Sequence, residues 1–138
     1  MDVSEIPFVK HLGIVEDENR VKMELHENIK NHLGTIHASA QFTLAETESG
    51  RYLLALFPDL EGKVLPLLRT SSVKYKHPAT KDLWATASME SAVKDKFKEQ
   101  FRKRGRATIT VHVALHDSEG LLTMEGAFTW FIQGEIKL

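Results

Sequence analysis

The sequence has 138 residues and no cysteine, 42% of its residues are hydrophobic, 27% are charged, and its formal net charge is -1. These values fit one globular domain over residues 1–138, and they exclude disulfides, thiolate metal sites and a cysteine nucleophile. The small net charge gives no general attraction to nucleic acid or to an anionic membrane. Because there is no apolar signal core and no run long enough to cross a bilayer, we expect a cytoplasmic protein.

The first part of the chain predicts a short helix or turn followed by one strand. Apolar residues within positions 1–12 could close one end of a core, namely Ile6, Phe8, Val9 and Leu12. After a turn at residues 17–19, residues 21–25 alternate between apolar and polar side chains, as a half-buried antiparallel strand does. Residues 28–34 are expected to form a loop.

A long buried helix is predicted over residues 35–57, because no proline interrupts this run and most of its sides are apolar or small. Thr35 is the predicted N-cap. Glu46 is unusual, because none of its helical neighbours is basic, whereas Glu48 has Arg51 three residues further on. An unpaired, half-buried carboxylate costs free energy unless a group outside the helix uses it. Glu46 is therefore either a functional acid or a core glutamate bonded to a backbone N–H or to a partner subunit.

The second half of the chain predicts an antiparallel sheet with one inserted helix. Strands are expected at residues 67–76, 82–90, 106–117 and 121–132, with a hairpin turn at 118–120 and a tail at 134–138. The helix covers residues 91–104, with Ser91 as its cap and Gly105 as its stop. Its apolar stripe consists of Val93, Phe97 and Phe101. A long helix packed on one face of an antiparallel sheet gives that sheet a core, so the pattern predicts an α+β fold.

Two motifs resemble those of the hotdog-fold acyl-CoA thioesterases. The first is Asn31-x-x-Gly34-Thr35-x-His37 followed by Ala45-Glu46, and the second is Tyr75-x-x-Pro78-Ala79. The nearest branch is the phenylacetate-pathway type with its poorly characterised bacterial relatives. The resemblance covers nearly the whole chain. It implies an antiparallel sheet wrapped around a long central helix, and a homodimer or a dimer of dimers.

The resemblance also implies hydrolysis of acyl-CoA thioesters without a cofactor, with Glu46 as general base or as nucleophile. Burial would raise the pKa of that carboxyl toward useful base strength. Asn31 would help to position water or the thioester, and the acid would come from the partner subunit. The start of the central helix would hold the thioester carbonyl through its free N–H groups, in a segment that includes Gly34, His37, Ala38 and Ser39.

The sequence departs from the family at two places. His37-Ala38-Ser39 stands where His-Gly-Gly is common, and Glu46 stands where Asp is common. Some relatives carry a polar helper on the strand that corresponds to residues 67–76, for which the nearest residues here are Thr70, Ser71 and Ser72. We interpret His37 as a helix-start residue bonded to backbone rather than as a catalytic group.

A basic segment at residues 94–106 is either a solvated helix face or a cradle for the phosphates of coenzyme A. The candidate phosphate ligands are Arg102, Lys103, Arg104 and Arg106, with Arg69, Lys74 and Lys76 as the next candidates. RNA binding is disfavoured, because no aromatic residues for base stacking are interleaved. His112 and His116 would lie about 13 Å apart on one strand face, too far to bind one ion, so we expect no metal site.

Two other functions stay open on the same fold. One is a non-catalytic module that binds or senses acyl-CoA. The other is a dehydratase acting on acyl thioesters, an enzyme class that pairs a loop histidine with a helix acid, whereas His37 is expected to start the helix. The identity of the acyl chain, and CoA as against carrier protein, are likewise open.

Overall fold

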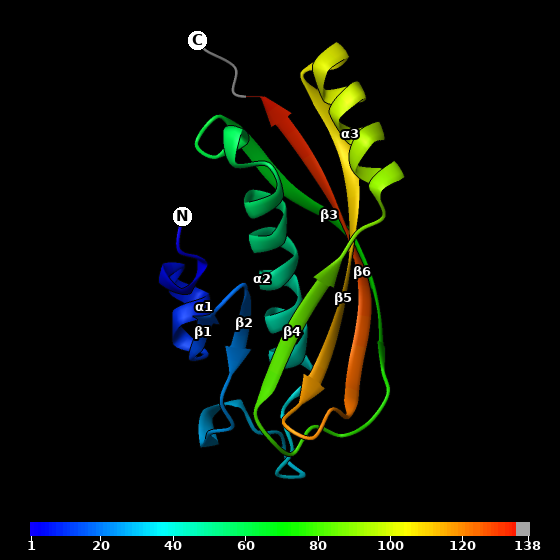
Figure 1. Cartoon of the computed structure of the whole chain (residues 1–138). Coiled ribbons are helices and arrows are strands. Elements are labelled where there is room, and N and C mark those ends of the chain that lie inside the picture. Colours follow the sequence, from blue (N-terminus) through cyan, green and yellow to red (C-terminus); the bar gives the residue numbers. More distant parts are fainter. Residues whose placement is uncertain (135–138) are drawn as a thin grey trace.

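The computed structural model describes residues 1–134, which form an antiparallel sheet wrapped around one long helix (Figure 1). The strands are β1 (Ile14–Asp17), β2 (Arg20–Met23), β3 (Val64–Tyr75), β4 (Leu83–Ser88), β5 (Arg106–Asp117) and β6 (Leu122–Gly134). The helices are α1 (Pro7–His11), α2 (Ala38–Leu56) and α3 (Ser91–Arg104), and short 3₁₀ turns occur at Val3–Glu5, Glu27–Ile29 and Pro58–Leu60. The predicted α+β fold is confirmed.

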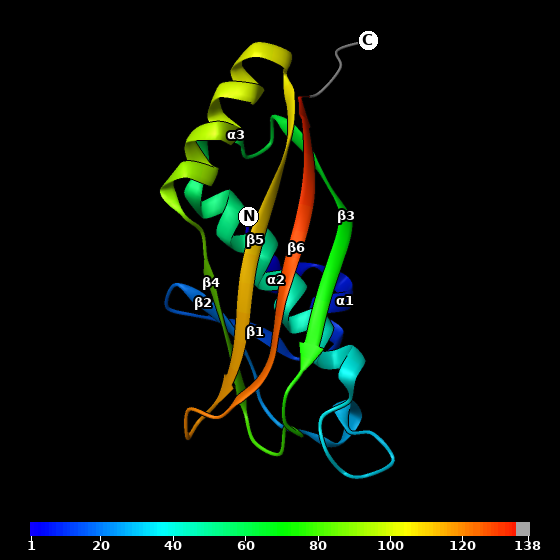
Figure 2. The ribbon, with the colours of Figure 1, turned by 90° about the vertical axis from the view of Figure 1, so that its right-hand side faces the viewer.

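The strands follow the order β1-β2-β4-β5-β6-β3, and every neighbouring pair is antiparallel. In this order β1 and β3 are the two edges of the sheet. Figure 2 shows β5, β6 and β3 side by side with α2 behind them. The sheet therefore curves around α2, and α2 is buried against its inner face.

Alternating side chains of β5 form the centre of the core. Ala107, Ile109, Val111, Val113 and Leu115 are all buried, as their spacing predicts. They meet the buried side of α2, where Leu44 and Ala45 have no exposed surface. Each large apolar side chain buried in this way contributes about 1.5–3 kcal/mol to folding. No helix within residues 1–134 is long and apolar enough to span a membrane.

The predicted helix caps are wrong, although α3 ends where expected. Helix α2 begins at Ala38 with His37 as N-cap, because the hydroxyl of Thr35 accepts a hydrogen bond from the side chain of Asn31 and stays in the loop. Helix α3 has Glu90 rather than Ser91 before its first residue, and no side chain caps it. The stop at Gly105 is confirmed, since this residue adopts φ 69° in the left-handed region.

Two strand predictions need correction. Strand β3 starts at Val64 and runs through Pro66, which is tolerated because β3 is an edge strand and one side of its backbone needs no partner. Two strands rather than one precede α2, because β1 and β2 form a hairpin. Leu25 lies beyond β2, where its N–H donates to Asp82 Oδ1 at 2.8 Å. In the predicted tail, Gly134 is the last residue of β6 and 135–138 lie outside the described residues.

The N-terminal segment closes one side of the core with only some of the expected residues. Val3 and Val9 are buried, with 3% and 5% of their surface exposed. Phe8, by contrast, is 61% exposed and Ile6 is 37% exposed. A short helix such as α1 can bury only one side against its neighbours, and Val9 occupies that side.

Candidate active site

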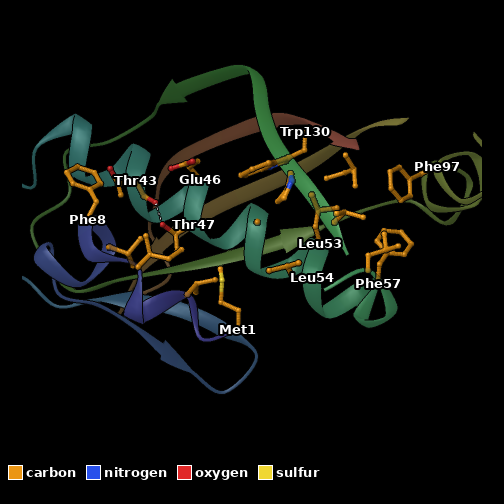
Figure 3. A pocket seen from close by; sticks show the side chains of 18 residues that line it. Met1, Phe8, Thr43, Glu46, Thr47, Leu53, Leu54, Phe57, Phe97 and Trp130 are labelled. Atoms are coloured by element: carbon orange, nitrogen blue, oxygen red, sulfur yellow. Dashed lines mark hydrogen bonds between the residues drawn. The ribbon is translucent and has the colours of Figure 1, made fainter. Parts of the chain in front are cut away.

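A cavity of about 360 Å³ lies alongside α2, between this helix, the N-terminal segment and strands β3 and β6 (Figure 3). Helix α2 and its C-cap residue Phe57 supply a continuous stripe of the lining, whose helical members are Thr43, Glu46, Thr47, Gly50, Leu53 and Leu54. The remaining lining residues are almost all apolar and include Val3, Phe8, Val64, Phe97, Trp130 and Ile132. Glu46 is the one charged side chain among the residues that line the cavity.

Glu46 has no neutralising partner among the residues that the structure describes. Within residues 1–134 its carboxylate forms no hydrogen bond and no ion pair. The neighbouring hydroxyls are already used, since Thr43 donates to Ser39 C=O at 2.9 Å and Thr47 donates to Thr43 C=O at 2.6 Å. Burial raises the pKa of Glu46 above its ordinary value, because the charged form loses water and gains nothing in exchange.

Glu48, on the same helix, is buried but paired. It is 1% exposed and forms a two-pronged ion pair with Arg51, as the spacing predicts. The guanidinium of Arg51 also donates to the C=O of Asn19 in the β1–β2 turn. Burial still raises the pKa of Glu48 above its ordinary value, although the Arg51 guanidinium opposes that shift. Glu48 therefore ties α2 to the sheet, whereas Glu46 faces the cavity.

His37 organises the start of α2. Its Nδ1 accepts the Ser39 N–H at 3.0 Å, so its role as a helix-start residue bonded to backbone is confirmed. The Ser39 N–H is thereby occupied, whereas the Ala38 N–H forms no hydrogen bond within residues 1–134. The four positions expected to face a thioester carbonyl are all exposed: Gly34, His37, Ala38 and Ser39.

Asn31 holds the loop before the helix. Its Oδ1 accepts the N–H groups of Leu33 at 2.9 Å and Thr35 at 3.1 Å, and its Nδ2 donates to the Thr35 hydroxyl at 2.9 Å. An amide nitrogen carries two hydrogens, so one donor of Asn31 is left over. Asn31 does not line the cavity that contains Glu46 of the same chain.

The Tyr75-x-x-Pro78-Ala79 motif holds the start of α2 from the sheet side. The Tyr75 hydroxyl donates to Ala38 C=O at 3.2 Å, and Ala79 C=O accepts the Ile36 N–H at 2.9 Å. Ala79 has no exposed surface. This motif therefore positions the helix start from the end of β3 and the loop that follows it.

One chain does not bring the two halves of the predicted site together. Along a helix with a rise of about 1.5 Å per residue, Ala38 and Glu46 are about 12 Å apart. The side of the cavity toward β3 is also open at Pro66, which lines the cavity and is exposed although it pairs with the buried residue Ile132. The helix start and Glu46 of the same chain cannot both contact one carbonyl group.

The basic segment lies at the far end of the cavity, where Phe97 of α3 joins the lining. Arg102 and Lys103 both pair with Glu99, at 3.0 Å and 3.2 Å, so part of their charge is already compensated. Arg104 and Arg106 are exposed and form no ion pair within the part of the chain that the structure describes. Of the secondary candidates, Arg69 lies over the ring of Phe131 and Lys76 pairs with Glu125.

Several lining residues were not predicted from the sequence as site residues. Phe97 was assigned to the core, and Trp130 and Gly50 were not singled out. Gly50 carries a usable signal, because a glycine inside a helix costs about 1 kcal/mol relative to alanine and often marks a close approach. A side chain at this position would meet the Trp130 ring at 3.4 Å.

The sequence matches a protein family called Domain of unknown function (DUF4442) over residues 6–132. The chain belongs to this family. No curated protein matches it in sequence. The DUF4442 chain is nevertheless similar in structure to several solved proteins.

PA5026 of Pseudomonas aeruginosa, a protein of unknown function named as a probable thioesterase, is 24% identical, with a TM-score of 0.82 over 96% of this chain and 91% of that one. Thioesterase HI1161 of Haemophilus influenzae is 16% identical, with a TM-score of 0.72 over 98% and 88%. BH2602 of Bacillus halodurans, solved with CoA, is 19% identical, with a TM-score of 0.71 over 91% and 74%. The hotdog fold expected for this DUF4442 protein is confirmed.

Proposed function

We propose that this protein hydrolyses acyl-CoA thioesters, with Glu46 as general base or nucleophile. The observation that carries the proposal is a single carboxylate that no group within residues 1–134 pairs, with a raised pKa, facing a cavity whose lining is almost all apolar. Such a carboxylate is costly to bury and is a stronger base than an ordinary carboxylate. The thioesterase names of two structural neighbours and the CoA bound in a third support the same reaction.

In the base route, Glu46 takes a proton from water while the water oxygen attacks the thioester carbonyl carbon. The C–S bond then breaks, and the CoA thiolate leaves and takes up a proton. In the nucleophile route, Glu46 attacks the same carbon and water later cleaves the acyl-enzyme anhydride. In both routes the carbonyl oxygen becomes negative, and the Ala38 N–H is the free helix-start donor that could stabilise it.

The experiment that tests the proposal is an assay of hydrolysis across a panel of acyl-CoA thioesters, in which the free thiol that is released is measured. Turnover by the wild-type protein that Glu46→Gln abolishes would support it. A second function is favoured by one observation, namely that His37 already occupies the Ser39 N–H. With that donor unavailable, the protein could bind acyl-CoA without cleaving it. Tight binding without turnover of any panel member would favour this alternative.

We further propose that the site is shared between two copies of the chain, so that Asn31 and the helix start of one copy face Glu46 of the other. The spare amide hydrogen of Asn31, the exposed helix start and the open side of the cavity all support this arrangement. Strand β3 offers a twelve-residue free edge with two exposed leucines, Leu65 at 52% and Leu67 at 45%. Such an edge invites pairing with another strand.

We expect the wild-type protein to be a stable dimer or a dimer of dimers in light scattering at micromolar concentration. Lysine on an edge strand opposes strand pairing, so Leu65→Lys with Leu67→Lys should dissociate the assembly and abolish turnover while the fold remains. Leu121→Lys is the matched control, because Leu121 is a 41% exposed leucine in the β5–β6 turn. A monomeric wild-type protein with full activity would contradict the shared site.

Of the four predicted candidates for the CoA phosphates, Arg104 and Arg106 are the two that no acid engages within residues 1–134, although α3 joins the cavity at the end away from Glu46. The phosphates do not change during thioester cleavage, so Arg104→Glu with Arg106→Glu should raise KM and leave kcat near its wild-type value. The effect should shrink with added salt and disappear for a short thioester without the nucleotide. An unchanged KM for acyl-CoA at low salt would assign this segment to a solvated helix face.

A further inference from the structure

The cavity extends far beyond Glu46. Its α2 stripe continues from Glu46 through Gly50 and Leu54 to Phe57, and Figure 3 shows Phe57 and Phe97 together at the end away from Glu46. At a rise of about 1.5 Å per residue, Glu46 and Phe57 are about 16 Å apart along the helix. A fully extended polypeptide gains about 3.6 Å per residue over three bonds, which is about 1.2 Å per bond. An extended alkyl chain of about a dozen bonds matches the length of the cavity.

The lining and the volume agree with that length. Past Gly50 every lining residue is apolar: Leu53, Leu54, Phe57, Leu60, Val64, Pro66, Phe97, Trp130 and Ile132. The volume of about 360 Å³ is many times the volume of about 10–15 Å³ that one water molecule needs by the same measure, so the cavity has room for a long chain. A single aromatic ring would fill only the part nearest Glu46 and leave the rest of the apolar wall unoccupied.

Trp130 lies against Gly50, one helical turn beyond Glu46, and both residues line the cavity. Its indole N–H donates to the Ser49 hydroxyl at 2.9 Å, and that hydroxyl donates to Glu46 C=O at 2.6 Å. This places the ring against Gly50, where an added Cβ would lie 3.4 Å and 3.6 Å from two ring carbons. In Figure 3 Trp130 lies between Glu46 and the pair formed by Phe57 and Phe97. A chain that runs along α2 from Glu46 to the distal part therefore passes this contact.

We propose that the cavity binds straight-chain acyl groups of about ten to twelve carbons, which run along α2 past the contact between Gly50 and Trp130 toward Phe57 and Phe97. This inference rests on the proposed thioesterase function for the identity of the acyl carrier. What it adds is the length and shape of the acyl chain, and binding of such a chain can be measured without catalysis. Each additional buried methylene should improve binding about fourfold until the end of the cavity is reached.

The probes are butanol, octanol and dodecanol, which carry the chain without a charge beside Glu46. Trp84→Phe makes Trp130 the only tryptophan, so its fluorescence reports on the cavity. In this background, Gly50→Leu should still bind butanol and should lose octanol and dodecanol. Leu54→Phe, one turn further along, should keep octanol and weaken dodecanol. Ala55→Leu adds bulk on an exposed position of α2 outside this cavity, and should match the parent protein.

The same chain-length order should appear in KM for acyl-CoA hydrolysis by these variants. Melting curves check that each variant is folded. Because Gly50→Leu and Leu54→Phe should exclude chains of different length, comparing them distinguishes a blocked cavity from a general loss of structure. Equal dodecanol binding by the parent, folded Gly50→Leu and Ala55→Leu would overturn the inference, as would a parent that binds none of the three alcohols. Graded alcohol binding without thioester turnover would instead leave the chain site standing and refute the proposed hydrolysis. Thioester turnover that does not depend on chain length would support the proposed hydrolysis and refute the acyl-chain site.

Discussion

Replacing Glu46 by glutamine should lower kcat for acyl-CoA hydrolysis by at least about 100-fold, the usual contribution of a positioned general base. Glutamine keeps the shape of the side chain and cannot take a proton or form an acyl-enzyme. The loss should be the same for acyl-CoA and for a short thioester without the nucleotide, which distinguishes Glu46 from the basic segment. Steady-state kinetics on both substrates measure it.

The Glu46→Gln protein should also be more stable than the wild type at pH 7. Because burial raises the pKa of Glu46, the folded protein keeps this proton to a higher pH than the unfolded chain does. The carboxyl therefore favours folding below its ordinary pKa of about 4.3, and that contribution is lost as the pH rises through the folded pKa. The stability gain of the variant should accordingly fade as the solution is acidified.

Glu48→Gln is the comparison for the activity loss, because it makes the same change two residues away on the other side of α2. Glu48 is paired with Arg51 and does not line the cavity, so the folded variant should keep kcat near the wild-type value. Activity retained in Glu46→Gln and lost in Glu48→Gln would show that the wrong carboxylate has been chosen.

Replacing Arg51 by methionine should destabilise the protein by about 3 kcal/mol, the cost of leaving a buried charge without its partner. Glu48 is 1% exposed and would lose both hydrogen bonds, and the C=O of Asn19 would lose its donor as well. Thermal unfolding followed by circular dichroism should show a lower Tm. Turnover measured below that temperature should be nearly unchanged.

The double variant Glu48→Gln with Arg51→Met should recover part of that stability, because it removes the stranded charge together with its partner. Lowering the pH should reduce the difference in stability between Arg51→Met and the wild type. Without the guanidinium the pKa of Glu48 rises further, so the group favours folding at low pH and this contribution is lost as the pH rises through its folded pKa. A Tm of Arg51→Met equal to that of wild type at pH 7 would mean that the pair contributes nothing.

Elements with strong local patterns could be predicted from the sequence. Strand β5 spans residues 106–117 as expected, because five apolar residues alternate without interruption between a glycine and a turn. Helix α3 spans the expected residues because Gly105 provides a left-handed stop. Pro66 misled the prediction of β3, since proline excludes a central strand but is compatible with an edge, and the strand order is not visible in local sequence.

The candidate site was predictable only in part. The contrast between Glu46 and Glu48 depends on neighbours three or four residues away, and the structure bears out the pairing of Glu48 with Arg51. Thr35 looked like a cap because its residue type favours that role, but Asn31 holds it in the loop and His37 takes its place. The cavity was not predicted, because its wall combines residues from Val3 to Ile132 that only tertiary packing brings together.

The strand order has a consequence for how the chain reaches its fold. Strand β3 is made near the middle of the sequence, yet its only partner within residues 1–134 is β6, which ends at Gly134. During synthesis the backbone of β3 therefore stays without its partner until residues 122–134 have left the ribosome. Such a long-range pairing forms slowly, and until it forms the unpaired strand is prone to aggregate. A chain that stops before β6 would lose the partner of both β5 and β3, and it would tend to aggregate.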